Sequence, residues 1–208
     1  MTPNDAVLLV GPTGAGKTPL GDALAKSGVG TRRCFHFDFG ANLRRIAAGR
    51  DVPDTFDHDD LHIVRDVLTV GALLEDESFH IAEKILHAFM EDMAIGDRDL
   101  LILNGLPRHV GQARDTDRLV NMSAILSLEC TPDIVQARIH RNTGGDRTGR
   151  LDDSLAKIQA KLKTFQERTR PLLQYYANKG IPVHRLTVGT ETTPTQMLDM
   201  AVSVLSVK

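Results

Sequence analysis

The stretch that decides the fold is residues 6–18, AVLLVGPTGAGKT. Its first five residues form a continuous apolar run, typical of a strand buried on both faces of a parallel sheet. Residues 11–18 then satisfy the pattern G-x-x-x-x-G-K-[ST], ahead of a helix predicted to run to about Lys26. Backbone N–H groups of such a loop surround phosphates, and the helix start adds its positive end. The residues expected to hold nucleotide phosphates are Gly14, Ala15, Gly16 and Lys17, with the Thr18 hydroxyl as a ligand for Mg²⁺.

The same alternation of strand and helix continues along the chain. Mainly apolar runs predict further strands at residues 100–103 and 124–128. Shorter or more mixed segments are interpreted as strands at residues 35–38 and 181–188. Helical patterns occupy residues 43–48, 77–93, 132–141, 152–178 and 194–204, with a kink expected near Pro171. Residues 51–60 hold five aspartates and a proline, which indicates an exposed acidic loop. This order predicts an α/β fold with a mainly parallel sheet.

Composition narrows the function classes. With 208 residues, 41% hydrophobic residues and a net charge of −2, we expect one globular domain that is not a strongly basic nucleic-acid binder. Cys34 and Cys130 are too few for a disulfide framework or a four-cysteine zinc site, and the eight histidines lack metal spacing, so no zinc is expected. We expect no signal peptide, because residues 1–10 lack a basic start, and no apolar run is long enough to cross a membrane. We expect a cytoplasmic monomer without a membrane or nucleic-acid partner.

Four further segments, in register with the phosphate loop, resemble adenylate kinases. Residues 40–44, GANLR, resemble the G-D-x-L-R segment, and residues 104–108, NGLPR, with Gln112, resemble D-G-F-P-R…Q. Arg138 and the later GRLDD at 149–153 are similar to the borders of the family's lid. Residues 171–180, PLLQYYANKG, resemble the end of its long helix. The resemblance extends over residues 6–205.

The resemblance implies a P-loop NTPase-type core with a five-stranded parallel sheet flanked by helices. It also implies an acceptor-binding lobe at about 39–76 and a short lid at about 138–151. The implied reaction transfers the γ-phosphoryl group of Mg·ATP to AMP and gives two ADP. Four arginines lie between positions 138 and 150 against one aspartate, Asp146, a charge excess that suits two phosphate chains.

The resemblance also assigns roles by position. Arg44 and Arg108 are expected to hold the acceptor phosphate, Gln112 to pair with the adenine edge, and Arg138 to cover the ATP adenine. Arg150 is expected to bridge donor and acceptor phosphates, with Asp152 and Asp153 orienting the arginines. The resemblance places Arg141 and Arg147, which could share a role, on ATP. It places Phe39, Gly40, Leu73, Leu74, Gly105 and Lys161 on AMP.

Several positions depart from the family pattern. Phe39 stands in place of a threonine, Lys161 in place of an arginine, and Thr18 follows Lys17 directly, without the usual intervening glycine. Asn104 replaces an aspartate that helps to hold the water shell of Mg²⁺, a task that a neighbour such as Asp38 could perform instead. These departures leave two alternatives open: a kinase for another nucleoside monophosphate, or a nucleotide-binding regulatory protein with weak activity.

Overall fold

The computed structural model describes residues 3–146 and 155–206. Five strands form one sheet in the order β2-β3-β1-β4-β5, and every neighbouring pair is parallel. The register places Leu9 opposite Asn104 and Asp38 opposite Asn104, so three strands end at the same level. The strands are β1 (Asp5–Val10), β2 (Cys34–Asp38), β3 (Leu100–Asn104), β4 (Asn121–Glu129) and β5 (Val183–Thr187).

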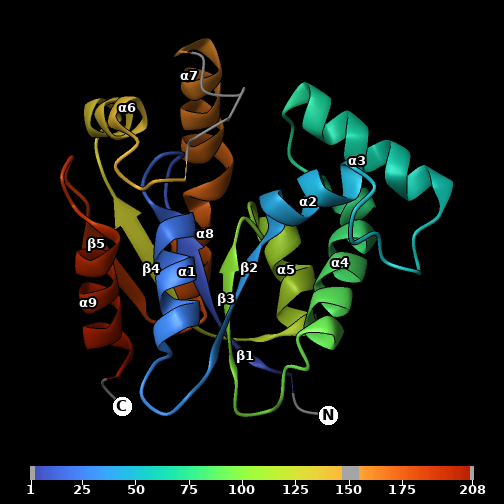
Figure 1. The fold of residues 1–208 in the computed structure, drawn as a ribbon, viewed down its shortest axis with the longest axis horizontal. Coiled ribbons are helices and arrows are strands. Elements are labelled where there is room, and N and C mark those ends of the chain that lie inside the picture. Colours follow the sequence, from blue (N-terminus) through green and yellow to red (C-terminus); the bar gives the residue numbers. More distant parts are fainter. Residues whose placement is uncertain (1–2, 147–154, 207–208) are drawn as a thin grey trace.

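Helices cover both faces of this sheet (Figure 1). One buried apolar cluster joins the sheet to α1 and α9, through residues such as Leu24 and Met197. A second cluster on the other face joins it to α4, α5 and α8, through residues such as Ile85 and Tyr176. The α-helices are α1 (Lys17–Ser27), α2 (Phe39–Ala47), α3 (His58–Val70), α4 (Phe79–Asp92), α5 (Val110–Leu119), α6 (Pro132–Arg141), α7 (Leu155–Thr164), α8 (Pro171–Asn178) and α9 (Pro194–Leu205), and a short 3₁₀ turn, η1 (Asp76–Ser78), precedes α4.

The predicted α/β fold with a five-stranded parallel sheet is confirmed. The sequence did not predict two of the helices, α3 and α5. The acidic stretch at 51–60 is only partly a loop, because α3 begins inside it at His58. Asp57 caps that helix and Asp60 returns a bond to the backbone of Asp57, so these acids serve as helix-start residues. Asp60 is 2% exposed, which corrects the expectation of a wholly solvated segment.

The long helix predicted for residues 152–178 is divided in the part that the structure describes. A five-residue π-helical turn, η2 (Phe165–Thr169), separates α7 from α8, and the backbone N–H of Arg170 donates to Phe165 O at 2.8 Å. Pro171 has no N–H and begins α8 at a position where none is needed. The predicted kink at the proline is therefore replaced by a wider turn just before it.

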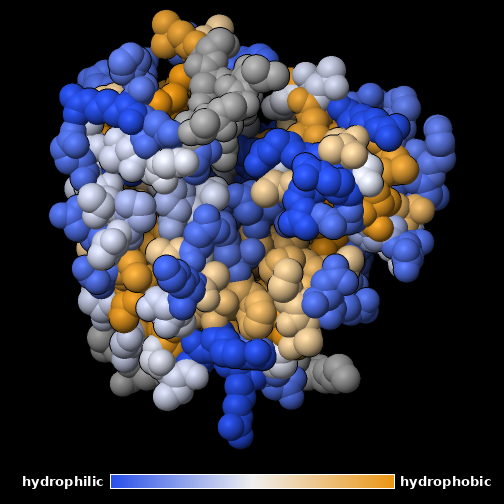
Figure 2. Space-filling view, viewed as in Figure 1, coloured by the Kyte–Doolittle hydropathy of each residue, from blue (hydrophilic) through white to orange (hydrophobic). Residues whose placement is uncertain are grey.

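The surface seen in the space-filling view is mixed. Figure 2 shows that hydrophilic residues predominate on this face, with smaller apolar patches where the edge strand β2 runs between α1 and α4. Within residues 3–146 and 155–206, no helix is both long and apolar enough to cross a membrane.

Candidate active site

A cleft of about 360 Å³ opens at the carboxyl edge of the sheet. In Figure 1, α2 and α3 lie on one side above the strands and α6 and α7 on the other. Ligands of open α/β sheets bind at this edge, where loops leave the strand ends. The cleft is lined by the phosphate loop, the ends of β2 and β3, the start of α2, the end of α3 with the segment after it, and the inner face of α7 and η2.

The phosphate loop connects β1 to α1 in a conformation that requires glycine. Gly14 and Gly16 have φ values of 77° and 99°, and Gly16 is the N-cap of α1. A Cβ on Gly16 would lie 2.8 Å from Met197 Cε, and one on Gly14 would lie 2.7 Å from Ile139 Cγ1. The loop is therefore packed closely from behind while its other side faces the cleft. Lys17 Nζ donates to the carbonyl oxygens of Gly11 at 2.7 Å and Pro12 at 2.9 Å.

Three oxygen-bearing side chains meet beside the loop. Thr18 Oγ1 donates to Asp38 Oδ2 at 2.7 Å, and Asn104 Nδ2 donates to the same carboxylate oxygen at 3.0 Å. Asn104 Nδ2 also lies 3.1 Å from Thr18 Oγ1. Hydroxyl and carboxylate oxygens are ligands that Mg²⁺ prefers, so Thr18 and Asp38 suit a magnesium ion bound with nucleotide phosphates, while Asn104 presents its amide nitrogen to both. Among the described residues there is no cluster of three or more His, Cys, Asp and Glu side chains that could hold a metal by itself.

A histidine, His36, contacts one of these three side chains, Asn104. The His36 side chain is 6% exposed; its Nδ1 lies 2.8 Å from Asp22 Oδ1, and its Nε2 lies 3.4 Å from Asn104 Nδ2. Gly21 of α1 makes room for the ring, because a Cβ there would lie 2.3 Å from two ring atoms of His36. The polar contacts therefore extend from the surface carboxylate of Asp22 to the phosphate loop.

The far side of the cleft carries two guanidinium groups. Arg44 comes from the last turn of α2 and Arg108 from the loop after β3, and both line the cleft. Neither guanidinium pairs with a carboxylate among the residues that the structure describes. Burial lowers the pKa of half-buried Arg108. A desolvated cation without a counter-ion favours binding of an anion, and guanidinium groups fit phosphate oxygens in pairs.

Gln112 lines the cleft, and its side chain is held by hydrogen bonds to the backbone. Its side chain is 1% exposed; Oε1 accepts from the Arg108 N–H at 2.7 Å, and Nε2 donates to Leu74 O at 2.8 Å. His109 Nε2 lies 3.1 Å from the same Leu74 carbonyl. Both ends of the amide are thus engaged by backbone groups that border the cleft, and the pairing of Gln112 with an adenine edge remains a prediction.

The other positions assigned to AMP line the cleft as a mainly apolar wall. Phe39 is 4% exposed and stacks on Phe37, with ring centroids 6.1 Å apart. Lys161 reaches the cleft from α7. The structure therefore brings together Phe39, Gly40, Arg44, Leu73, Leu74, Gly105, Arg108, Gln112 and Lys161 around one opening.

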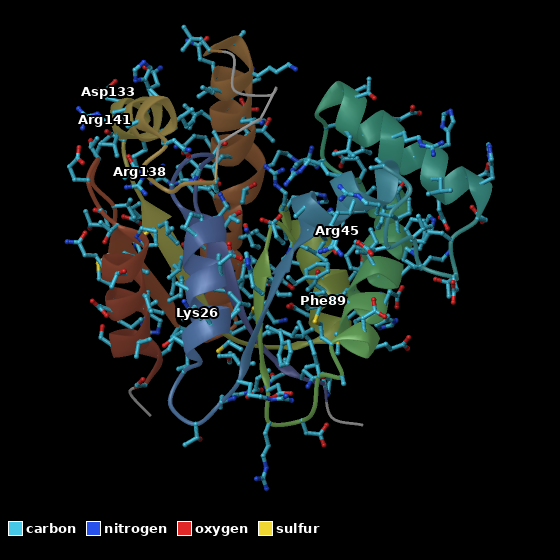
Figure 3. All side chains as sticks on the ribbon, in the orientation of Figure 1. Lys26, Arg45, Phe89, Asp133, Arg138 and Arg141 are labelled. Carbon is cyan, nitrogen blue, oxygen red and sulfur yellow. The ribbon has the colours of Figure 1, made fainter. Side chains whose placement is uncertain are left out.

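The arginines of α6 lie away from that opening. Arg138 is 2% exposed, and its guanidinium donates to the carbonyl oxygens of Gly14 at 3.2 Å, Gly189 at 2.7 Å and Thr192 at 2.8 Å. Its Nη2 is buried and has no hydrogen-bond partner among the described residues. Figure 3 shows Arg138 between α6 and the start of α9, and Arg141 farther out, where it pairs with Glu191. In this conformation Arg138 joins two loops, and its stacking on an ATP base remains a prediction.

The remaining lid positions, Arg147, Arg150, Asp152 and Asp153, lie outside the described residues. Several cleft residues were not predicted from the sequence, among them Lys157, Phe165 and Thr169. Thr169, in the π-helical turn, lines the cleft and is 8% exposed, and its Oγ1 is buried without a hydrogen-bond partner in the described part of the chain. No sequence signal marks this position, because nothing in residues 165–169 predicts a π turn.

Comparison with known proteins assigns a family. A family model described as an AAA domain matches residues 7–159, well over half of the chain. The chain belongs to this AAA-domain family. Curated relatives of this AAA-domain protein include an adenylate kinase of Thermus thermophilus, 27% identical over 87% of this chain and 88% of the relative. An adenylate kinase of Deinococcus deserti is 29% identical over 86% of this chain and 87% of the relative. The resemblance to adenylate kinases is therefore confirmed.

Two further matches extend the range of relatives of the AAA-domain chain. A uridylate kinase of Saccharomyces cerevisiae is 25% identical over 57% of this chain and 56% of the relative. Among solved structures, a gluconokinase of Sinorhizobium meliloti superposes with a TM-score of 0.56 at 15% identity and covers 99% of this chain and 94% of that one. At that identity the likeness shows the fold alone and supports no statement about the acceptor.

Proposed function

We propose that the protein is a nucleoside monophosphate kinase that transfers the γ-phosphoryl group of Mg·ATP to AMP and gives two ADP. The observation that carries the proposal is the pairing of two anion sites across one cleft. The phosphate loop lies on one side, and the guanidinium groups of Arg44 and Arg108, without carboxylate partners among the described residues, lie on the other. A donor and an acceptor that both carry phosphates need this arrangement.

In this proposal the chain works mainly by positioning and charge. Lys17 follows the migrating phosphoryl group, and the loop backbone binds the donor phosphates. Arg44 and Arg108 hold the acceptor phosphate so that its oxygen lies in line with the γ-phosphorus. Bound Mg²⁺ would neutralise phosphate charge, and Thr18, Asp38 and Asn104 are the residues that would hold it. We further propose that residues 39–76 and 138–151 act as acceptor lobe and lid, in a monomeric cytoplasmic enzyme.

The first test is a coupled assay of the purified protein with ATP and a panel of AMP, CMP, UMP and GMP. The proposal predicts the highest kcat/KM with AMP. A higher value with CMP or UMP would overturn the adenylate assignment but keep the monophosphate kinase. Turnover with none of the four monophosphates, together with tight ATP binding, would favour the regulatory protein.

The second test compares neighbouring arginines on α2. Arg44→Met should raise the acceptor KM by roughly ten- to a hundredfold, because a charged hydrogen bond is worth about 1.5–3 kcal/mol. Arg45→Met is the matched control, since Arg45 is exposed and pairs with Asp51 outside the cleft. Equal acceptor KM values for the two variants would contradict the role of Arg44.

A kinase for another nucleoside monophosphate is the second candidate function, and two observations favour it. The Gln112 amide is engaged by the backbone at both ends, and Phe39 offers an apolar face beside the acceptor site. Neither feature selects adenine by hydrogen bonding in this conformation. The panel assay therefore decides between AMP and a pyrimidine monophosphate.

A further inference from the structure

We infer that Asp38, at the end of β2, supplies the carboxylate that orients the magnesium of the bound nucleotide, and that Asn104 is its obligatory neutral neighbour. The inference rests on the proposed phosphoryl transfer only in assuming that the protein binds a metal–ATP complex. In this inference Asp38 is a positioning residue. Its negative charge replaces the charge of the aspartate that the family pattern has at position 104.

The sheet makes the two positions equivalent. Asp38 and Asn104 are register partners in the parallel pair β2–β3, and each is the last residue of its strand. Both side chains reach the same point, because Thr18 Oγ1 lies 2.7 Å from Asp38 Oδ2 and 3.1 Å from Asn104 Nδ2. A carboxylate on either strand would therefore face the hydroxyl that is expected to ligate the metal.

The contact between the two side chains explains why only one of them is charged. Asn104 Nδ2 donates to Asp38 Oδ2 at 3.0 Å. With a second carboxylate at 104, two negative groups would face each other at that distance, and one of them would take up a proton or turn away. The amide supplies a donor, which fixes the carboxylate toward Thr18.

Asp38 is also held from its other side. Its Oδ1 accepts from the Ala41 N–H at 2.8 Å and caps α2. An asparagine keeps an oxygen for this bond and is an equally good N-cap, so Asp38→Asn removes the charge without removing the cap. The substitution therefore separates the electrostatic role of Asp38 from its structural one.

The test exchanges the charges of residues 38 and 104 and measures metal binding, which requires no acceptor nucleotide. Mn²⁺ binding to the protein–ATP complex is measured by electron paramagnetic resonance for the wild type, Asp38→Asn, Asn104→Asp and the double variant. Removing an outer ligand of this kind weakens metal binding by roughly ten- to a hundredfold. We expect that loss for Asp38→Asn, a weaker loss for Asn104→Asp, and recovery to within about threefold of the wild type in the double variant.

The control is Asp54→Asn, which removes one exposed negative charge from the loop before α3 and should bind Mn²⁺ as the wild type does. The inference would be overturned if Asp38→Asn bound Mn²⁺ as tightly as the wild type does. It would also be overturned if the double variant bound Mn²⁺ no more tightly than the weaker-binding single variant. Thermal unfolding without metal checks the fold, and if the double variant does not fold, the Asp38→Asn titration decides alone. Because no monophosphate is present, failure of the AMP proposal in the panel assay leaves this result unaffected.

Discussion

The amide nitrogen of Gln112 donates to the carbonyl oxygen of Leu74 at 2.8 Å, which ties α5 to the segment that leads from α3 into α4. That segment forms part of the cleft wall. The position of one buried amide therefore sets the shape of the proposed acceptor site, whether or not the amide also reads the base.

Replacement of Gln112 should affect the acceptor and stability together. In Gln112→Leu the Arg108 N–H loses its partner, whereas the Leu74 carbonyl loses one of two and retains the contact with His109 Nε2. An unsatisfied buried group costs about 1–3 kcal/mol. We expect a higher acceptor KM, a nearly unchanged ATP KM and a lower Tm. Steady-state kinetics and thermal unfolding measure these quantities. Gln174→Leu, on the exposed side of α8, is the control, and similar behaviour of the two variants would refute the role.

Lys17→Met removes the charge that the proposed mechanism places beside the donor phosphates. A contact of this kind is worth on the order of 3 kcal/mol in the transition state, about a hundredfold in rate. We expect kcat to fall by at least that factor, with Tm close to that of the wild type. Lys26→Met alters an exposed lysine at the other end of α1 and should leave kcat unchanged. Activity of Lys17→Met within a few-fold of the control would contradict the assignment.

Arg138→Lys tests the junction between the phosphate loop and the loop before α9. A lysine cannot reach the three carbonyl oxygens of Gly14, Gly189 and Thr192 together. We expect a loss of about 2 kcal/mol, or roughly 4–8 °C in Tm for a chain of this size, and weaker ATP binding. Arg141→Lys, on the same helix but exposed, should unfold at the wild-type temperature. Indistinguishable melting of the two variants would count against a joining role.

Asp60 gives a pH-dependent prediction. Burial alone would raise the pKa of Asp60, but hydrogen bonds from Lys84, the Asp57 N–H and His80 lower it below 3.8. A lowered folded-state pKa means that the ionised group stabilises the fold above the unfolded pKa, and that this stabilisation is lost as pH falls through the folded pKa. Asp60→Asn should therefore destabilise the protein by about 2 kcal/mol at pH 7.

The difference between wild type and Asp60→Asn should narrow when urea unfolding is repeated below pH 3.8, the ordinary pKa of aspartate. Asp59→Asn serves as the reference, because Asp59 is exposed beside Asp60 and should show no such narrowing. A gap for Asp60→Asn that is constant with pH would mean that the carboxylate is not the stabilising form.

The sequence predicted the parallel sheet because strands such as residues 6–10 and 100–103 are uninterrupted apolar runs that alternate with helical patterns. It predicted the start of α6 because Thr131 and Pro132 are typical of a helix N-terminus. It did not predict α3, because the acidic composition of its first turn is typical of a loop. The helix start is recognised only from the hydrogen bonds that the Asp57 and Asp60 side chains accept from each other's backbone N–H groups. Nor did it predict the buried state of Arg138, which depends on carbonyl oxygens 51 and 54 residues farther along the chain. Local pattern fixes elements, whereas the contacts of a side chain across the fold depend on packing.

The π-helical turn of residues 165–169 carries a consequence for insertions and deletions in this chain. A π turn holds one residue more than an α-helical turn for about the same rotation, so deleting one residue from it restores an ordinary turn and leaves the helix that follows in about the same orientation. Leu172 and Tyr176, both fully buried against the sheet, lie after the turn, and Phe165 and Thr169 within it line the cleft. The effect of the extra residue is therefore confined to the turn. A one-residue deletion within residues 165–169 is expected to leave Leu172 and Tyr176 against the sheet and to reshape the cleft wall at Phe165 and Thr169.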